Sequence, residues 1–332
     1  MRPLDPSAIH ARKRPVAIAT MFVAELAWAF VVATPVHEWA GRAWGAHPDG
    51  DAVLFAPGGR DLLLWLGQED AGLSVTARTT LVLLVVGAVL LQLPFGALVA
   101  SLAFGREVAA APSVPPANDA EEAHVAAPVV RSLRLVTALK IGVGAWLPLA
   151  ALLAFSALLS VIVLSLGGIV SSLMEHSLTA SLGDARAFTV RLVVLALFAA
   201  LAAVLGVIVD LARAAVVREV GVSAAVGASS SPGWSTMLRG LRTAMTTARR
   251  SLGRATLGWA GRAVGGVALV AIGYVAATAL GGRGGAALTG LFIVHQAVVL
   301  GRVALRASWM ARALALVAPV QDEREAKPSA AP

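Results

Sequence analysis

Four polar side chains lie near the middle of apolar stretches that are long enough to cross a bilayer. Glu25 lies in the first stretch, Gln92 in the second, and His295 with Gln296 in the last. A carboxylate at the bilayer centre costs at least about 2.5 kcal/mol on insertion scales, so it usually faces the interior of a helix bundle. Burial there favours the neutral acid. A proton-coupled transporter needs a carboxyl group of this kind.

A structural role for Glu25 is the alternative. A protonated or hydrogen-bonded glutamate would hold the first helix against the second or the sixth, and such interhelical bonds contribute about 0.6 kcal/mol on average. His295 and Gln296 are neighbours, about 100° apart on a helix, so both cannot face one partner squarely. The sequence therefore predicts one candidate intramembrane polar site, formed by Glu25, Gln92, His295 and Gln296. Both transport and helix packing remain open for it.

No motif for a catalytic, metal or cofactor site occurs in the sequence. His37 and Glu38 begin like H-E-x-x-H, but Gly41 stands where the second histidine must be, which excludes a metalloprotease of this type. There is no phosphate-binding loop ending in Lys-Ser/Thr, no G-x-S-x-G, and no cysteine for thiolate chemistry. We expect no enzyme, no cofactor and no metal site. A loosely bound metal in the polar loop with His47, Asp49 and Asp51 is the weaker alternative.

The composition favours lipid as the solvent. Hydrophobic residues make up 58% of the 332 residues and charged residues 14%, against about 45–50% and about 25% in soluble domains. A membrane span needs about 20 apolar residues. The pattern predicts an all-α polytopic bundle of six transmembrane helices, at residues 15–36, 79–104, 141–170, 188–210, 258–280 and 286–305.

The same pattern divides the chain into segments. We expect an N-terminal segment at 1–14, a first transmembrane hairpin at 15–104 with an outer loop at 37–78, a flexible linker at 105–127, a four-helix region at 128–312 containing an amphipathic helix at 234–257, and a tail at 313–332. Cytoplasmic loops retain lysine and arginine. With the N-terminus inside, 21 basic residues are cytoplasmic and 6 are outside. Six spans with both termini in the cytoplasm are therefore predicted.

The amphipathic segment combines an apolar stripe with arginines. The stripe is Trp234, Leu238, Leu241, Met245, Ala248, Leu252, Ala255 and Trp259, at steps of three and four. The arginines are Arg239, Arg242, Arg249, Arg250 and Arg254. This helix either lies at the inner interface with its arginines among anionic lipid headgroups or packs under the bundle. Aromatic and base-reading polar residues are missing from its basic face, so nucleic acid is not an expected partner.

One carboxylate lies at the cytoplasmic end of the fourth span. Pairing would cancel a charge close to lipid, where charge is expensive. We therefore expect an ionic clamp between hairpins rather than a catalytic acid, formed by Asp210, Arg213, Arg302 and Arg306.

The motif DLARAAVVRE at 210–219, followed by the arginine-rich segment and a last span ending in G-R-x-x-L-R at 301–306, resembles a broad group of uncharacterised bacterial multi-pass inner-membrane proteins. Those often carry D-Y-A-R, where this chain has Leu211. The resemblance covers roughly residues 140–312 and implies a six-helix bundle in the inner membrane, without an activity. We expect a non-enzymatic scaffold, accessory or assembly factor, with anionic lipids and possible protein partners or a homo-oligomer. The alternative is a transporter or permease built on Glu25, Gln92 and His295.

Overall fold

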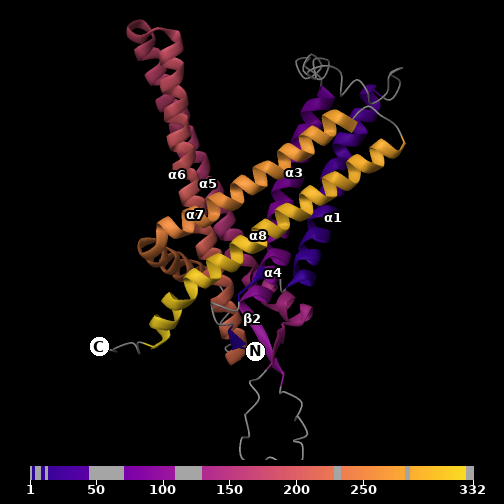
Figure 1. The fold of residues 1–332 in the computed structure, drawn as a ribbon, viewed down its shortest axis with the longest axis vertical. Helices are drawn as coiled ribbons and strands as arrows, with labels where there is room; N and C mark the ends of the chain where they lie inside the picture. Colours follow the sequence, from indigo (N-terminus) through magenta and orange to yellow (C-terminus); the bar gives the residue numbers. More distant parts are fainter. Residues whose placement is uncertain are drawn as a thin grey trace, which may run out of the picture.

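A computed structural model gives the structure of the protein. It describes residues 2–3, 9–11, 14–44, 71–108, 129–227, 233–280 and 285–326. In these residues the chain is a multi-pass helix bundle (Figure 1), with six segments that are long and apolar enough to cross a membrane. The predicted all-α, six-span architecture is confirmed. The helices are α1 (Pro15–Trp44), α3 (Ala71–Leu90), α4 (Gln92–Ala103), α5 (Leu135–Leu182), α6 (Asp184–Val226), α7 (Trp234–Leu280) and α8 (Ala286–Ala326).

The second span consists of two helices, α3 and α4, which are separated at Leu91. Pro94 lies in the first turn of α4. It has no N–H to donate to the carbonyl of Leu90 four residues earlier, and its ring would clash with that carbonyl in a continuous helix. The break therefore follows from the sequence.

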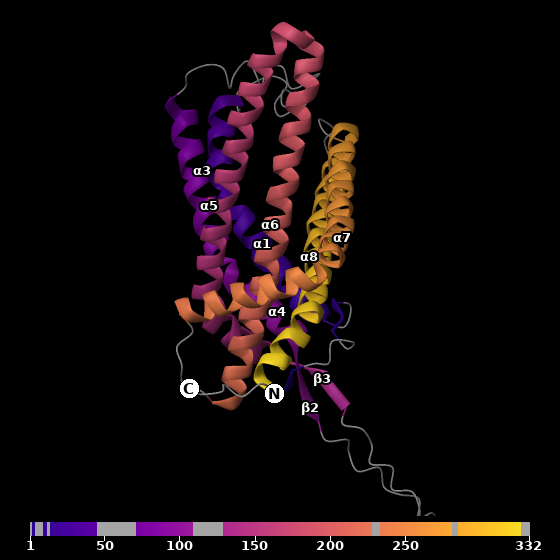
Figure 2. The same cartoon turned by 90° about the vertical axis from the view of Figure 1, so that its left-hand side faces the viewer.

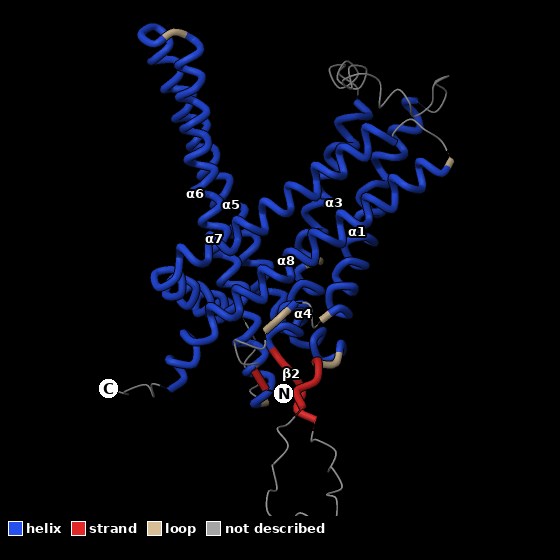
Figure 3. The backbone as a smooth tube through the Cα atoms, in the orientation of Figure 1, coloured by secondary structure: helices blue, strands red, loops and turns tan. Residues whose placement is uncertain are grey.

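A small antiparallel sheet at one end of the bundle was not predicted (Figure 3). Its strands are β1 (Arg2–Pro3), β2 (Phe104–Val108) and β3 (Val129–Ser132), in the order β1-β2-β3. Arg106 pairs with Arg131 in the β2–β3 register. The predicted linker at 105–127 is therefore wrong over residues 105–108, and residues 109–127 lie outside the described residues. We call this end of the bundle the base: the strands, α4, and residues 135–152, 207–226, 234–250 and 303–321.

The hydrophobic core lies at the base, where α4, α5, α6, α7 and α8 meet. Its largest fully buried side chains include Phe95, Phe104, Leu149, Met237 and Met310. Away from the base, the α5–α6 hairpin leans to one side and α1, α3 and the α7–α8 hairpin lean to the other (Figure 1). Apolar side chains on these outer parts are exposed, as expected of helices whose solvent is lipid.

Two predicted boundaries are wrong because helices continue past them. The loop at 171–187 is mostly helix: α5 runs past Gly167–Gly168 to Leu182, and the turn falls at Gly183, whose φ of 76° suits a residue without a side chain. The tail at 313–332 begins with helix, because α8 extends to Ala326. Leu314 and Val317 are fully buried against the core. This part of α8 thus belongs to the base.

The amphipathic segment is the first part of α7. The predicted end of the amphipathic helix at 257 is wrong, because the backbone leaves helical geometry at Ser251, with φ −145° and ψ 24°. Residues 234–250, which we call the arm, run across the base at a steep angle to the spans, and residues 252–280 then turn along the bundle (Figure 2). Gly240 allows the arm to approach α6, because a Cβ there would lie 2.6 Å from Cγ2 of Val216.

Candidate functional site: a polar cavity and an interfacial arm

A polar cavity of about 580 Å³ lies between α1, α5, α6, α7 and α8, close to the base. Two carboxylates and four guanidinium groups line it, namely Glu25, Asp210, Arg213, Arg262, Arg302 and Arg306. Charged groups so close to lipid are expensive unless they are paired or face a cavity. The arrangement therefore gathers charged side chains from four helices, α1, α6, α7 and α8, at one place.

Asp210 accepts hydrogen bonds on both of its carboxylate oxygens. Its Oδ1 accepts a hydrogen bond from Nη1 of Arg213 at 2.8 Å, and its Oδ2 accepts one from Nε1 of Trp309 at 2.9 Å. The Asp210 and Arg213 side chains are only 18% and 10% exposed. Because Trp309 is on α8, the carboxylate links α6 to α8. Nε of Arg213 has no hydrogen-bond partner among the described residues.

The other predicted members of the ionic clamp line the cavity without bonding to Asp210. Arg302 and Arg306 are one turn apart on α8, and Arg306 interacts electrostatically with both Asp210 and Glu25. The guanidinium of Arg306 also lies 4.6 Å from the ring centroid of Phe95. This cation–π contact holds the Arg306 side chain of α8 against α4. The structure thus places all four residues at one site, with Arg213 as the direct ion-pair partner.

The predicted intramembrane polar site is not brought together. Glu25 lines the cavity, but Gln92, His295 and Gln296 do not. Nε2 of Gln92 donates to the carbonyl of Ala88 at 2.9 Å, close by in the chain. His295 is exposed on the outer part of α8. The side-chain oxygens of Gln92 and Gln296 have no hydrogen-bond partner among the described residues.

The arm has three faces, and one of them is buried against the protein. This face consists mostly of small or polar side chains, such as Thr243, Ala244 and Thr247, together with the larger Met237, and all four are almost completely buried. The apolar stripe lies roughly 120° around the helix from this face. Trp234 is 67% exposed and Leu238 49%. Of the eight predicted stripe residues, Ala248 and Ala255 are buried.

Arginines form the third face of the arm. Arg239, Arg242, Arg249 and Arg250 are exposed there, and Arg254, just past the break at Ser251, is exposed as well. Nε of Arg239 forms an ion pair with Oε1 of Glu219 at 2.6 Å, which joins the arm to the end of α6. Of the two predicted roles of this helix, packing under the bundle applies to its buried face. Contact of its arginines with anionic lipid headgroups stays a prediction.

A second buried network, made of hydrogen bonds, links α6 to the end of α8. The sequence analysis did not predict it. Nη1 of Arg218 donates to the carbonyl of Ala318 at 3.0 Å and to Oε1 of Gln321 at 3.1 Å. Nε2 of Gln321 donates to the carbonyl of Ala215 at 3.1 Å. Gln321 lies in the region expected to be a tail, between the apolar residues 313–320 and the charged residues 322–325. A lone glutamine at such a junction gives no signal of burial.

In the described part of the chain, no three His, Cys, Asp or Glu side chains are grouped so that they could hold a metal ion. His37 and Glu38 belong to α1. The residues of the weaker metal alternative, His47, Asp49 and Asp51, lie outside the described residues, as does most of the predicted outer loop.

Comparison with known proteins does not place the chain in a family. The chain matches no protein family, no curated protein and no solved structure.

Proposed function

We propose that this chain is a non-enzymatic protein of a bacterial inner membrane, serving as a scaffold, accessory or assembly factor whose base rests on anionic lipid of the cytoplasmic leaflet. The observation that carries the proposal is the three-faced arm. A helix that lies across the spans, with large apolar side chains on one free face and arginines on the next, fits the boundary between acyl chains and headgroups.

The charge distribution supports the orientation. Each arginine near a negatively charged membrane surface contributes about 1 kcal/mol of attraction, and the arm carries several. The ends of α6 and α8 and the strands lie at the same end of the bundle as the arm (Figure 2). The excess of basic residues in segments at this end agrees with a cytoplasmic location.

Neutralising Arg249 on the arm and Arg254 just past the end of the arm should weaken the preference for anionic lipid. We expect Arg249→Gln with Arg254→Gln to reduce the enrichment of phosphatidylglycerol over phosphatidylcholine around the protein in mixed bilayers by several-fold, because about 2 kcal/mol of attraction is removed at low salt. The measurement is the quenching of arm tryptophan fluorescence by brominated lipids of each type. A matched pair, Arg186→Gln with Arg191→Gln near the far end of α6, should leave the enrichment unchanged. An equal loss in both pairs would contradict the assignment of the lipid contact to the arm.

A transporter is the second candidate, and one observation favours it. Glu25 faces the polar cavity with Arg302 and Arg306. Its predicted partners Gln92 and His295 are elsewhere, so the scaffold proposal comes first. Proton flux into proteoliposomes that is lost in Glu25→Gln would reverse this order.

A further inference from the structure

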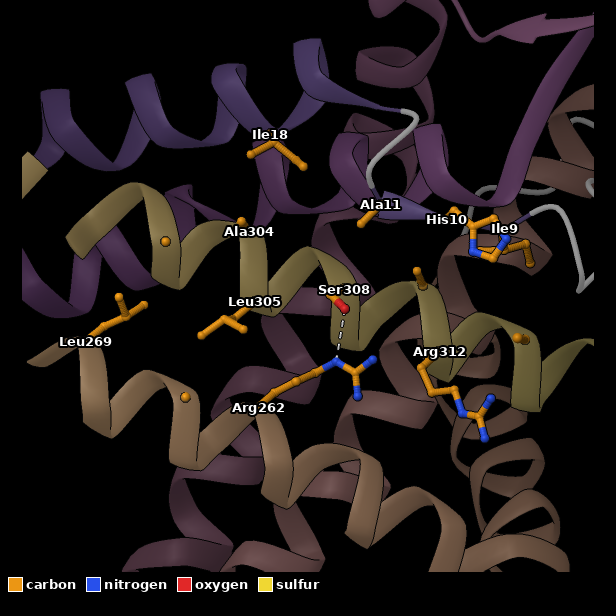
Figure 4. Close-up of a pocket in the computed structure, with 14 residues that line it drawn as sticks. Ile9, His10, Ala11, Ile18, Arg262, Leu269, Ala304, Leu305, Ser308 and Arg312 are labelled. Atoms are coloured by element: carbon orange, nitrogen blue, oxygen red, sulfur yellow. Dashed lines mark hydrogen bonds between the residues drawn. The ribbon is translucent and has the colours of Figure 1, made fainter. Parts of the chain in front are cut away.

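A separate groove lies on the other side of α8. It has a volume of about 1060 Å³ and runs between residues 9–11 with Ile18, the second part of α7, and α8 (Figure 4). Along α8 its floor is a stripe of mostly small side chains from Gly301 to Ala315, which leaves open space between the helices. Arg262 and Leu305 line both this groove and the polar cavity.

The polar groups of the groove are gathered toward one end. His10 and Arg312 lie at the end near the base, and Arg262 lies beside Ser308 (Figure 4). Nε of Arg262 donates to Oγ of Ser308 at 3.1 Å. Arg312 is exposed and forms no hydrogen bond or ion pair with any residue in the described part of the chain. The two arginines repel each other electrostatically.

Among the described residues that line the groove none is acidic, in contrast to the polar cavity with its two carboxylates. Two guanidinium groups without a neutralising carboxylate favour an anion between them. A phosphate group suits this position, because arginine donates several charge-assisted hydrogen bonds to its oxygens.

The other end of the groove is apolar, and the whole groove is about as long as one lipid leaflet is thick. Ile18, Leu269 and Ala304 line it, on the side away from His10 and Arg312 (Figure 4). From Arg312 to Gly301 is eleven residues, or about 16 Å along a helix. Half of a bilayer's hydrocarbon core is about 15 Å. An acyl chain could therefore follow the apolar wall while its headgroup stays at the basic end.

We propose that the groove between residues 9–11, the start of α1, α7 and α8 is a binding site for one anionic phospholipid, with the phosphate at Arg312 and Arg262 and an acyl chain along Ile18, Leu269 and Ala304. This proposal rests on the proposed function in one respect, the placement of the base at the cytoplasmic leaflet. It adds a single saturable site to the general contact made by the arm.

Binding of one lipid per chain can be measured by native mass spectrometry of the delipidated full-length protein titrated with phosphatidylglycerol. We expect a first lipid to bind with higher affinity than later ones and more tightly than phosphatidylcholine. Arg312→Gln should weaken this first affinity by about tenfold or more, because a charge-assisted contact to the phosphate is lost. Arg186→Gln, an exposed arginine on α6, should leave it unchanged.

Two further measurements separate a lipid from a free anion and from misfolding. Ala304→Phe fills the apolar end without changing charge and should also weaken the first affinity, with an unaltered unfolding midpoint. Glycerol phosphate, which has the headgroup phosphate but no acyl chain, should not compete at the lipid's own concentration. Unchanged affinity in both Arg312→Gln and Ala304→Phe, or full competition by glycerol phosphate, would overturn the proposal.

The variants also separate this site from the arm. If the Arg249 and Arg254 variants keep the enrichment of anionic lipid, the proposed function fails while the groove stands on its own affinity measurement. If Arg312→Gln and Ala304→Phe do not change the affinity for the first lipid but the Arg249 and Arg254 variants do lower the enrichment, the proposed lipid site in the groove is wrong and the lipid contact of the arm stands.

Discussion

Replacing Asp210 by alanine should lower the free energy of unfolding by about 3–5 kcal/mol, since removing one partner of a buried ion pair leaves the other charge without compensation. The carboxylate holds Arg213 and the indole of Trp309 at the same time. Its loss also removes one of the two carboxylates that line a cavity with four arginines. The measurement is the unfolding midpoint in a mixed-detergent titration.

Asp184→Ala is the matched control for this effect. Asp184 lies in the first turn of the same helix and is exposed, so its interaction with the helix dipole contributes under about 1 kcal/mol. Asp210→Asn keeps an acceptor for Trp309 and should fall between wild type and Asp210→Ala. A loss of less than 1 kcal/mol in Asp210→Ala would contradict the role of this carboxylate as the link between α6 and α8.

Replacing Arg218 by leucine should cost about 2–4 kcal/mol and loosen the end of α8. The change leaves the buried Oε1 of Gln321 and the carbonyl of Ala318 without their donor, and each unsatisfied buried group costs about 1–3 kcal/mol. Proteolysis of α8 beyond Arg312 should accelerate in the variant. The readouts are the unfolding midpoint and the rate of cleavage within residues 313–326.

A double-mutant cycle tests whether the two side chains act together. Gln321→Leu alone should also destabilise, and the double variant should lose less than the sum of the single ones, with a coupling of about 1–2 kcal/mol. Arg186→Leu, an exposed arginine on the same helix, should change stability by about 0.5 kcal/mol or less. Strict additivity would show that Arg218 and Gln321 stabilise the base independently.

The spans could be predicted because lipid makes length and hydropathy nearly sufficient to identify them. The positions of Asp210 and Arg213 followed from the high cost of charge near lipid. The polar site around Glu25 could not be predicted, because mid-span position does not determine which way a helix is rotated or where it crosses its neighbours. Gln92 and His295 face other surroundings for this reason.

The sequence pattern also could not predict which residues of the arm are buried at the base. The arm buries threonine, glycine and alanine and exposes tryptophan and leucine, the reverse of a helix on a soluble protein. Apolar periodicity identifies a stripe but does not distinguish lipid from protein as its neighbour. Most of residues 313–321 are buried at the base, and their apolar run ALALVAPV is a signal of burial that the prediction of a tail did not use.

The location of the arm is tested most directly by spin labels in liposomes. The chain has no cysteine, so a single nitroxide can be attached at Leu238→Cys, Arg249→Cys or Thr243→Cys without background. We predict that the label at 238 collides mainly with oxygen, which concentrates in lipid, and the label at 249 mainly with a water-soluble nickel chelate, while the label at 243 is shielded from both. Equal nickel accessibility at 238 and 249 would contradict the placement of the arm at the membrane interface.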